Sequence, residues 1–371
     1  MKNILHLFAA FAVVAFFTAC GDDDNSGGGG VEPPPSVNLA QSRQDMAGHL
    51  ANQFILPAFD ALARDVADLK AEVDAMEGQI NQANLDRVRS ALRSSRITWQ
   101  AAAIYQMGPA IANALRSSAN TYPVDVDKVD GFISSGEYTL GTLASQGAVG
   151  FPAIDYLINA HGALDRLSEA DGAAYKYLKD VTDFLNDQVS LVADEWKSDS
   201  FLTNFASEAA NGTDVGSALG MLINSIDLHL QRFLRDGKVA IPAGVRSAGV
   251  PRPKLVESFY GGYSVVLLRE AVNDYVNLLK GRGANDLEGT SLLAYLRLIE
   301  QEALAQNIET VLSDLQSKVD LLNDPLQDQI ATDNDKLIDV FLSFQELVGY
   351  FKTDIASVTG VTITNQDVDG D

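Results

Sequence analysis

The sequence has few of the residues that build disulfide frameworks, zinc clusters and nucleic-acid interfaces. Cysteine occurs once and histidine four times among 371 residues, which excludes an internal disulfide framework and a cysteine-based zinc cluster. Lysine and arginine number 27 against 50 aspartates and glutamates, and this net charge of −23 argues against a nucleic-acid partner. Hydrophobic residues at 46% and charged residues at 21% are typical of a globular protein. The length indicates about two domains.

The first twenty residues have the features of an export signal. Lys2 supplies a positive charge, and the apolar run over 7–17 is too short to cross a membrane. The run leads into residues 17–20 (FTAC), which resemble a bacterial lipobox, where cleavage precedes a cysteine that then carries a diacylglycerol. We therefore expect residues 1–19 to be a signal peptide and Cys20 to be lipidated. The alternative is an ordinary signal peptide followed by an incidental cysteine.

Residues 20–36 have the composition of a tether. Glycines at 27–30 favour flexibility, and prolines at 33–35 favour an extended chain. The acidic run 22–24 directly after Cys20 resembles the signal that sends lipoproteins of Bacteroidetes-type bacteria to the outer face of the outer membrane. Alternatively, these acidic residues only solvate the tether. The expected location is the bacterial outer membrane, with the protein lipid-anchored and exposed on the cell surface.

Helical periodicity dominates the rest of the chain. One stripe in 175–196 carries eight apolar residues at helical spacing: Tyr177, Leu178, Val181, Phe184, Leu185, Val189, Val192 and Trp196. A second such stretch covers 335–355, and others lie near 38–77, 80–106, 214–236, 256–281 and 290–322. Only residues 361–364 have the pattern of a β-strand. The sequence therefore predicts an all-α protein made of up-down helical bundles.

Breaks in the helical pattern predict the domain organisation. The pattern is interrupted at 209–216, so we expect an N-terminal bundle over 37–210 and a C-terminal bundle over 211–371. Two long irregular loops are expected at 117–147 and 237–253, and loops of this length inside helical domains usually carry function. Pro57 predicts a kink or break in the first helical stretch.

Five separated stretches carry a family resemblance. They are 96–99 (RITW) with 107–109 (MGP), 122–130 (YPVDVDKVD), 150–157 (GFPAIDYL), 235–244 (RDGKVAIPAG) with 256–260 (VESFY), and 360–364 (GVTIT) with 369–371 (DGD). In this order they resemble the imelysin-like family, also called peptidase M75. The resemblance implies two helical bundles related by duplication, with the functional cleft where they meet. It also implies a bacterial envelope protein connected with the uptake of iron or other metals.

The family's signature is a Gly-x-His-x-x-Glu pattern that is proposed to bind metal. His and Glu three residues apart on a helix face the same way and can share one cation. Here Gly150 matches the pattern, but Pro152 stands at the histidine position and Asp155 at the glutamate position. Because proline has no lone pair to donate, the imidazole ligand is absent, and only weak metal binding by Asp155 is expected. The alternative for Asp155 is a carboxylate that caps a helix or forms an ion pair.

Two further groups are candidates for the lining of the cleft. Arg96 and Trp99 lie in the first matching stretch, where they would hold an anionic group or form a wall; otherwise they belong to a solvated face and the core. Glu257, Ser258 and Tyr260 are expected at the start of the helix that follows the proline-rich loop. There they would face Asp155 or, alternatively, cap that helix.

These observations predict a non-catalytic surface lipoprotein that binds a ligand or partner in iron or metal uptake through a cleft between two bundles. No cofactor is expected beyond a weakly held divalent metal. The expected partners are the membrane, through the lipid, and proteins of metal or haem uptake. One alternative is a metallopeptidase, although a catalytic zinc normally needs three protein ligands. The other is a structural or glycan-binding surface lipoprotein.

Overall fold

The computed structural model describes residues 38–198, 200–207, 210–283 and 290–364. Within these ranges the chain is helical and has no β-strand, so the predicted all-α class is confirmed. The expected signal peptide and the lipidated Cys20 lie outside the described residues. No helix in the described ranges combines the length and the apolarity that crossing a membrane requires.

Helices of ten or more residues make up the framework. They are α1 (Leu39–Leu50), α2 (Leu56–Asp74), α3 (Gln82–Ala102), α6 (Val126–Ser135), α7 (Gly150–Asn159), α9 (Ala173–Lys197), α11 (Ala218–Leu228), the π-helix η4 (His229–Ala240), α13 (Ser264–Lys280), α15 (Glu302–Asp320) and α17 (Asp335–Gly349). The shorter elements are η1 (Ala51–Ile55), α4 (Gly108–Ala112), α5 (Leu115–Ala119), η2 (Leu143–Ser145), α8 (Ala163–Leu167), α10 (Ser200–Phe205), α12 (Ile241–Ala243), η5 (Val245–Ser247), η6 (Pro253–Leu255), α14 (Leu292–Leu298), α16 (Leu326–Thr332), η8 (Tyr350–Ile355) and α18 (Ala356–Thr359).

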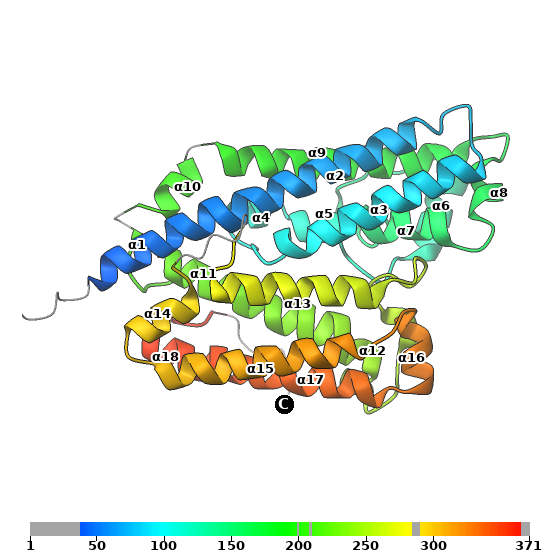
Figure 1. The fold of residues 1–371 in the computed structure, drawn as a ribbon. Coiled ribbons are helices and arrows are strands. Elements are labelled where there is room, and N and C mark those ends of the chain that lie inside the picture. Colours follow the sequence, from blue (N-terminus) through cyan, green and yellow to red (C-terminus); the bar gives the residue numbers. More distant parts are fainter. Residues whose placement is uncertain (1–37, 199, 208–209, 284–289, 365–371) are drawn as a thin grey trace, which may run out of the picture. The chain divides into compact units, whose positions relative to one another are not determined.

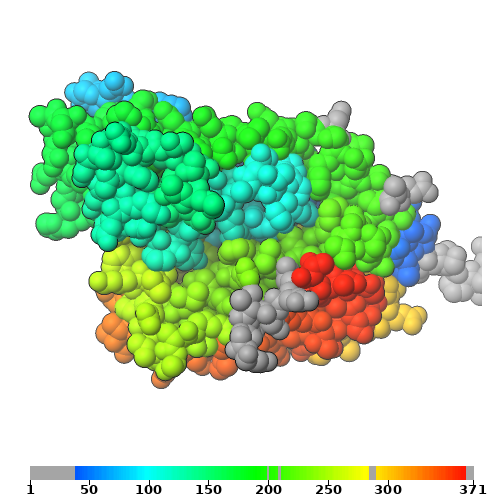
Figure 2. Space-filling model, turned by 180° about the vertical axis from the view of Figure 1, so that it is seen from behind, coloured from blue at the N-terminus to red at the C-terminus, as the bar shows by residue number. Residues whose placement is uncertain are grey.

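The long helices pack in two groups. In one, α2 lies against α3 and α9, and α7 contacts both α3 and α9. In the other, α17 packs against α15 and η4, and α13 against α15 (Figure 1). Contacts between α3 and α13 join the groups. Figure 2 shows the opposite face, where the teal residues of α4 to α6 lie over the yellow-green residues that lead from η4 to η6.

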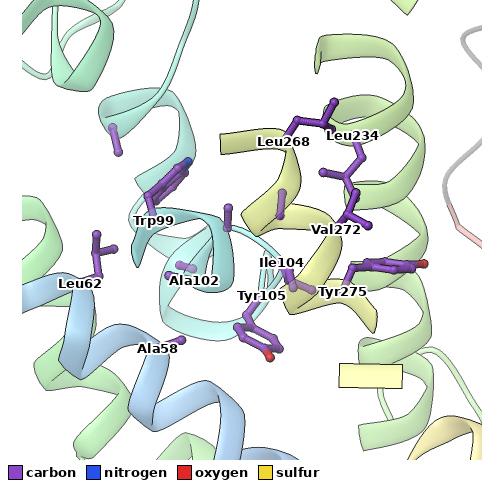
Figure 3. Packing of buried hydrophobic residues seen from close by; sticks show 14 of the residues in the cluster. Ala58, Leu62, Trp99, Ala102, Ile104, Tyr105, Leu234, Leu268, Val272 and Tyr275 are labelled. Atoms are coloured by element: carbon purple, nitrogen blue, oxygen red, sulfur yellow. The ribbon is translucent and has the colours of Figure 1, made fainter. Parts of the chain in front are cut away.

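A single hydrophobic cluster runs through both groups of helices. Figure 3 shows its central part, where Trp99 of α3 lies between Leu62 of α2 and the side chains of α13 and η4, such as Leu268 and Leu234. All four of these side chains are almost completely buried. The described residues from Asn38 onward accordingly form one compact unit. The division into a bundle over 37–210 and another over 211–371 stays a prediction.

Pro57 does not break its helix. The chain remains helical from α1 to α2, and the irregularity is the π-helical segment η1 directly before the proline. Leu56 donates its backbone N–H to Ala51 O, five residues earlier, so the wider turn accommodates a residue that has no N–H to donate.

Several predicted boundaries are wrong. The expected loop 117–147 contains α6, which begins at an Asp125 cap and ends at Gly136 in the left-handed conformation. The expected loop 237–253 is helical up to Ala243, because η4 continues into α12. The expected helix 290–322 is interrupted between α14 and α15. Residues 361–364 form no strand, and this segment is instead hydrogen-bonded to the side chain of Asn224.

Candidate functional site

Gly150 fixes how α7 enters the site. Its φ of +71° lies in the left-handed region, and a Cβ at this position would be 2.3 Å from Ala119 O. Only glycine meets both conditions without strain. Pro152 is the third residue of α7, where its missing N–H leaves no intrahelical hydrogen bond unmade. The matching glycine therefore keeps its structural role, although the histidine that follows it in the signature is absent.

Asp155 forms a buried ion pair with Arg96. Arg96 Nη1 lies 3.2 Å from Asp155 Oδ2, and the two side chains are 0% and 2% exposed. Asn159 donates to the other carboxylate oxygen at 2.9 Å, while the Ser258 hydroxyl lies 3.5 Å from Oδ2. Burial opposes the charged form of Arg96, but Tyr263, Asp155 and other acidic groups raise the pKa of Arg96 above its ordinary value. Asp155 is thus an ion-pairing carboxylate, and Arg96 is not on a solvated face.

Glu257 is the centre of a second buried cluster. Its carboxylate forms an ion pair with Lys238 of η4 and accepts hydrogen bonds from Asn120 at 2.8 Å and Gln100 at 3.3 Å. Burial opposes ionisation of Glu257, but Lys238 and Arg96 outweigh it and hold the pKa of Glu257 at about 2. Arg96 Nη2 also donates to the Glu257 backbone carbonyl at 2.6 Å, which connects the two clusters. The four charged groups form one buried network in which each charge has an opposite partner.

A cavity of about 190 Å³ lies beside this network. Four of the eight predicted residues line it, namely Pro152, Asp155, Glu257 and Tyr260. Asp155 and Glu257 thus line one cavity. Ligand binding there stays a prediction.

The other four predicted residues lie outside the cavity wall. Arg96 and Ser258 are fully buried behind it, and Gly150 packs against the backbone of α5. Trp99 is a core residue, 1% exposed, with its ring 5.9 Å from that of Phe151. The apolar spacing along α3 is the signal that predicts this role.

Glu257, Ser258 and Tyr260 do not start a helix. They lie in a turn, and α13 begins only at Ser264, so the predicted capping roles are wrong. The turn is tight because Gly261 lies against Asp155, where a Cβ would be 2.7 Å from Oδ1. The sequence signal for this turn is the Gly261-Gly262 pair, which is unfavourable inside a helix.

Sequence reasoning missed Lys238, Asn120 and Tyr122. Lys238 was expected in a loop, but the π-helix η4 places it beside Glu257. Long π-helices are rare and occur frequently at functional sites, and no periodicity in the sequence predicts this one. Tyr122 lies in one of the stretches that carry the family resemblance, and it lines the cavity.

The residues of this cavity do not fit a zinc or iron ion held by histidine and glutamate. Pro152 has no donor atom, the Asp155 carboxylate is paired with Arg96, and that of Glu257 is paired with Lys238. His161, the nearest histidine in sequence, is exposed in the turn after α7. Across the described part of the chain, no group of three or more His, Cys, Asp or Glu side chains is placed to hold a metal ion.

Comparison with known proteins places the chain in a family. A sequence model of imelysin, peptidase M75, matches residues 55–343. The chain belongs to the imelysin family. The matched range includes 150–155, the stretch that resembles the family signature.

Two crystal structures resemble the fold of this imelysin-family chain. One is a protein from Parabacteroides distasonis, provisionally described as an iron-regulated protein A precursor, with a TM-score of 0.70 and 16% identity over 86% of this chain and 95% of its own. The other is an imelysin-like protein from Psychrobacter arcticum, with a TM-score of 0.70 and 15% identity over 88% of this chain and 98% of its own. No curated protein shows significant similarity to the chain.

Proposed function

We propose that this chain is a non-catalytic surface lipoprotein that binds a ligand or partner in iron uptake through the cleft at Asp155, Glu257 and Tyr260. The observation that carries the proposal is the Arg96–Asp155 ion pair. It occupies the carboxylate that would otherwise be the remaining metal ligand of the family signature. A cleft built of neutralised ion pairs suits recognition through hydrogen bonds better than metal-assisted hydrolysis.

Membership of the imelysin family supports a role related to iron. The similar fold of the provisionally described iron-regulated protein from Parabacteroides distasonis agrees with that role. The lipobox-like residues 17–20 and the acidic run 22–24 support anchoring at the cell surface.

Growth under iron limitation tests the proposal. A strain that lacks the gene should grow more slowly in iron-limited medium, and the wild-type gene should restore growth. Tyr260→Ala should fail to restore growth, because this half-buried ring forms part of the cleft wall. Tyr350→Ala is the matched control, since Tyr350 is also half-buried but lies in η8, away from the cleft. Equal growth of the deletion strain and the wild type in iron-limited medium would contradict the proposed role.

The anchor is tested separately with Cys20→Ala. Loss of the thiol should release the protein from the membrane fraction in detergent partitioning. Replacing the acidic residues 22–24 with alanine should lower the accessibility of the protein to protease on intact cells. A Cys20→Ala protein that stays membrane-bound would contradict lipidation at Cys20. Unchanged protease accessibility of the acidic-run variant would contradict the role of residues 22–24 in export to the cell surface.

The metallopeptidase alternative is tested with the purified protein. Incubation with a mixed peptide library and added zinc or ferrous iron should give no cleavage, because Pro152 and the paired carboxylates leave no open ligand set. Cleavage that is abolished by a chelator would reverse the assignment as non-catalytic.

A further inference from the structure

A second and larger pocket lies next to the cleft. Its volume is about 640 Å³, compared with about 190 Å³ for the cleft, and Tyr122, Pro123 and Leu255 line both. Sites for organic ligands typically measure about 300–1,000 Å³, so the larger pocket has the volume for such a molecule. The pocket lies where α4 and α5 meet η4, on the face that Figure 2 shows.

The charge of the pocket wall is opposite to that of the protein. Two arginines line it, Arg116 of α5 and Arg232 of η4, and none of the lining residues is an aspartate or glutamate. This contrasts with a chain that has nearly twice as many acidic as basic residues. Among the described residues neither arginine has a carboxylate within ion-pair distance. A ligand with a negative charge would therefore meet attraction in the pocket and repulsion over most of the rest of the surface.

Arg116 is held in place without a counter-ion. Its guanidinium carbon lies 3.5 Å from the centre of the Phe233 ring, and Nη2 donates to Ala103 O and to His229 Nδ1. Its Nε is buried and has no hydrogen-bond partner. Burial lowers the pKa of Arg116 to about 9, although Tyr122 and the distant Glu257 act in the opposite direction. The Arg116 side chain is half-buried, and its guanidinium has no carboxylate partner among the described residues. A partly desolvated cation without a counter-ion, on the wall of a pocket, indicates a site for an anion.

The rest of the wall is largely apolar. Ile111 is 62% exposed and Ile241 is 37% exposed, and both line the pocket together with Phe233, Pro123 and Leu255. Large apolar side chains that remain exposed around a concave site are typical of ligand pockets.

From this combination we infer that the pocket binds an organic anion, a molecule with a flat apolar body and a carboxylate or sulfonate group that contacts Arg116 and Arg232. The apolar body lies against Phe233 and Ile111. This inference does not depend on the role in iron uptake, because it follows from the volume, charge and lining of a pocket that contains neither Asp155 nor Glu257.

A fluorescent probe tests the inference on the purified full chain. The anionic dye 8-anilinonaphthalene-1-sulfonate should bind at one molecule per chain, and uncharged N-phenyl-1-naphthylamine should bind about tenfold more weakly. Ile111→Glu should weaken dye binding at least about tenfold, because it places a carboxylate on the pocket wall without disturbing a buried side chain. Arg232→Gln should weaken it several-fold, and Arg232→Lys should keep most of the affinity.

Leu342→Glu is the matched control. Leu342 of α17 is 55% exposed, close to the exposure of Ile111, and this change adds the same charge far from the pocket wall. It should leave dye binding unchanged. The inference is overturned if the two glutamate variants bind the dye equally, if the uncharged compound binds as tightly as the sulfonate, or if no stoichiometric binding occurs. If a strain with Ile111→Glu still grows normally under iron limitation while its purified protein no longer binds the dye, the binding inference stands and the pocket is not required for the proposed role in iron uptake.

Discussion

Arg96 neutralises Asp155 inside the protein, 3.2 Å away and closed off from solvent. Pro152 stands three residues before Asp155, at the position of the signature histidine. Of the two signature ligands, the imidazole and the carboxylate, only the carboxylate is therefore present. Because this carboxylate is paired with Arg96, it serves as a structural contact and not as a metal ligand. Two separate features, the proline and the arginine contact, oppose metal binding.

Metal binding at this site should need changes at the signature positions and at Arg96. Pro152→His with Asp155→Glu supplies an imidazole and a longer carboxylate at i, i+3 spacing, yet Arg96 would compete for that carboxylate. We expect weak zinc binding by this double variant and tighter binding when Arg96→Gln is added, as measured by calorimetry with zinc and ferrous iron. Arg96→Gln alone is the control. Tight zinc binding by the native chain would contradict this interpretation of the site.

The buried Lys238–Glu257 pair should be strongly coupled. Lys238→Met or Glu257→Gln alone leaves one buried charge without its partner and should cost about 3–5 kcal/mol in the free energy of unfolding. The double variant should lose much less than the sum of the single variants. Urea denaturation at pH 7 measures all three, with Lys336→Met as the control, since its ion pair is exposed and contributes about 0–1 kcal/mol. Additive losses would show that the two charges do not stabilise each other.

The pKa of Glu257 sets the pH range of this effect. Because the pKa is about 2 in the folded protein and ordinarily 4.5, the stabilisation from its ionised form is complete above pH 4.5. It is lost as the pH falls from there through about 2. The loss in the free energy of unfolding caused by Glu257→Gln, measured by urea denaturation, should therefore become smaller as the pH is lowered from 4.5 towards 2.

The fold could be predicted from the sequence further than the site. Apolar spacing predicted helices such as 175–196, which corresponds to α9, since burial of one face dominates the energetics of a long amphipathic helix. The same spacing gives no information about which polar side chains meet across helices. Arg96 follows Arg89 and Arg93 on one stripe, and Arg89 also reaches α7, where it donates to Ile158 O. What distinguishes Arg96 is that it is fully buried and donates to the backbone of Glu257, which is distant in sequence.

Turns and irregular helices account for most of the remaining errors. The turn that carries Glu257 depends on the approach of Gly261 to Asp155, a contact between positions about a hundred residues apart. The π-helix that places Lys238 next to Glu257 has the residue composition of an ordinary amphipathic helix. The Gly261-Gly262 pair signals a turn but not its contact with Asp155, and nothing in the residues of η4 distinguishes a π-helix from an α-helix.

Gly150→Ala should destabilise the site more than a comparable glycine change elsewhere. The new methyl group would meet Ala119 O at 2.3 Å in addition to the strain of a φ of +71°, for a loss of about 3 kcal/mol or more. Gly162→Ala is the matched control. It has a φ of +75° and no atom within 4 Å of the added Cβ, so only about 1–2 kcal/mol of backbone strain is expected. Equal losses in urea denaturation would show that close packing at Gly150 is unimportant.

Asp274 of α13 should make the protein less stable in alkaline solution. Burial, assisted by the charge of Glu270, raises the pKa of Asp274 from 3.8 to about 8. A carboxyl group whose pKa is raised by folding favours the native state below its unfolded pKa. This advantage is lost as the pH rises from about 4 to about 8. Asp274→Asn removes the cost of burying an ionised carboxylate at high pH, because an amide stays neutral.

The Asp274→Asn protein should therefore be more stable than the wild type at pH 8, by at most a few kcal/mol, and the difference should disappear towards pH 4. Denaturation midpoints at pH 4, 6 and 8 measure this trend. Asp339→Asn, at an exposed position on α17, controls for the removal of one negative charge from an acidic protein. If Asp274→Asn instead destabilises the protein equally at every pH, the carboxyl group acts through a hydrogen bond that the amide cannot make. A titration of Asp274 near pH 8 would then be excluded as the cause of any alkaline instability.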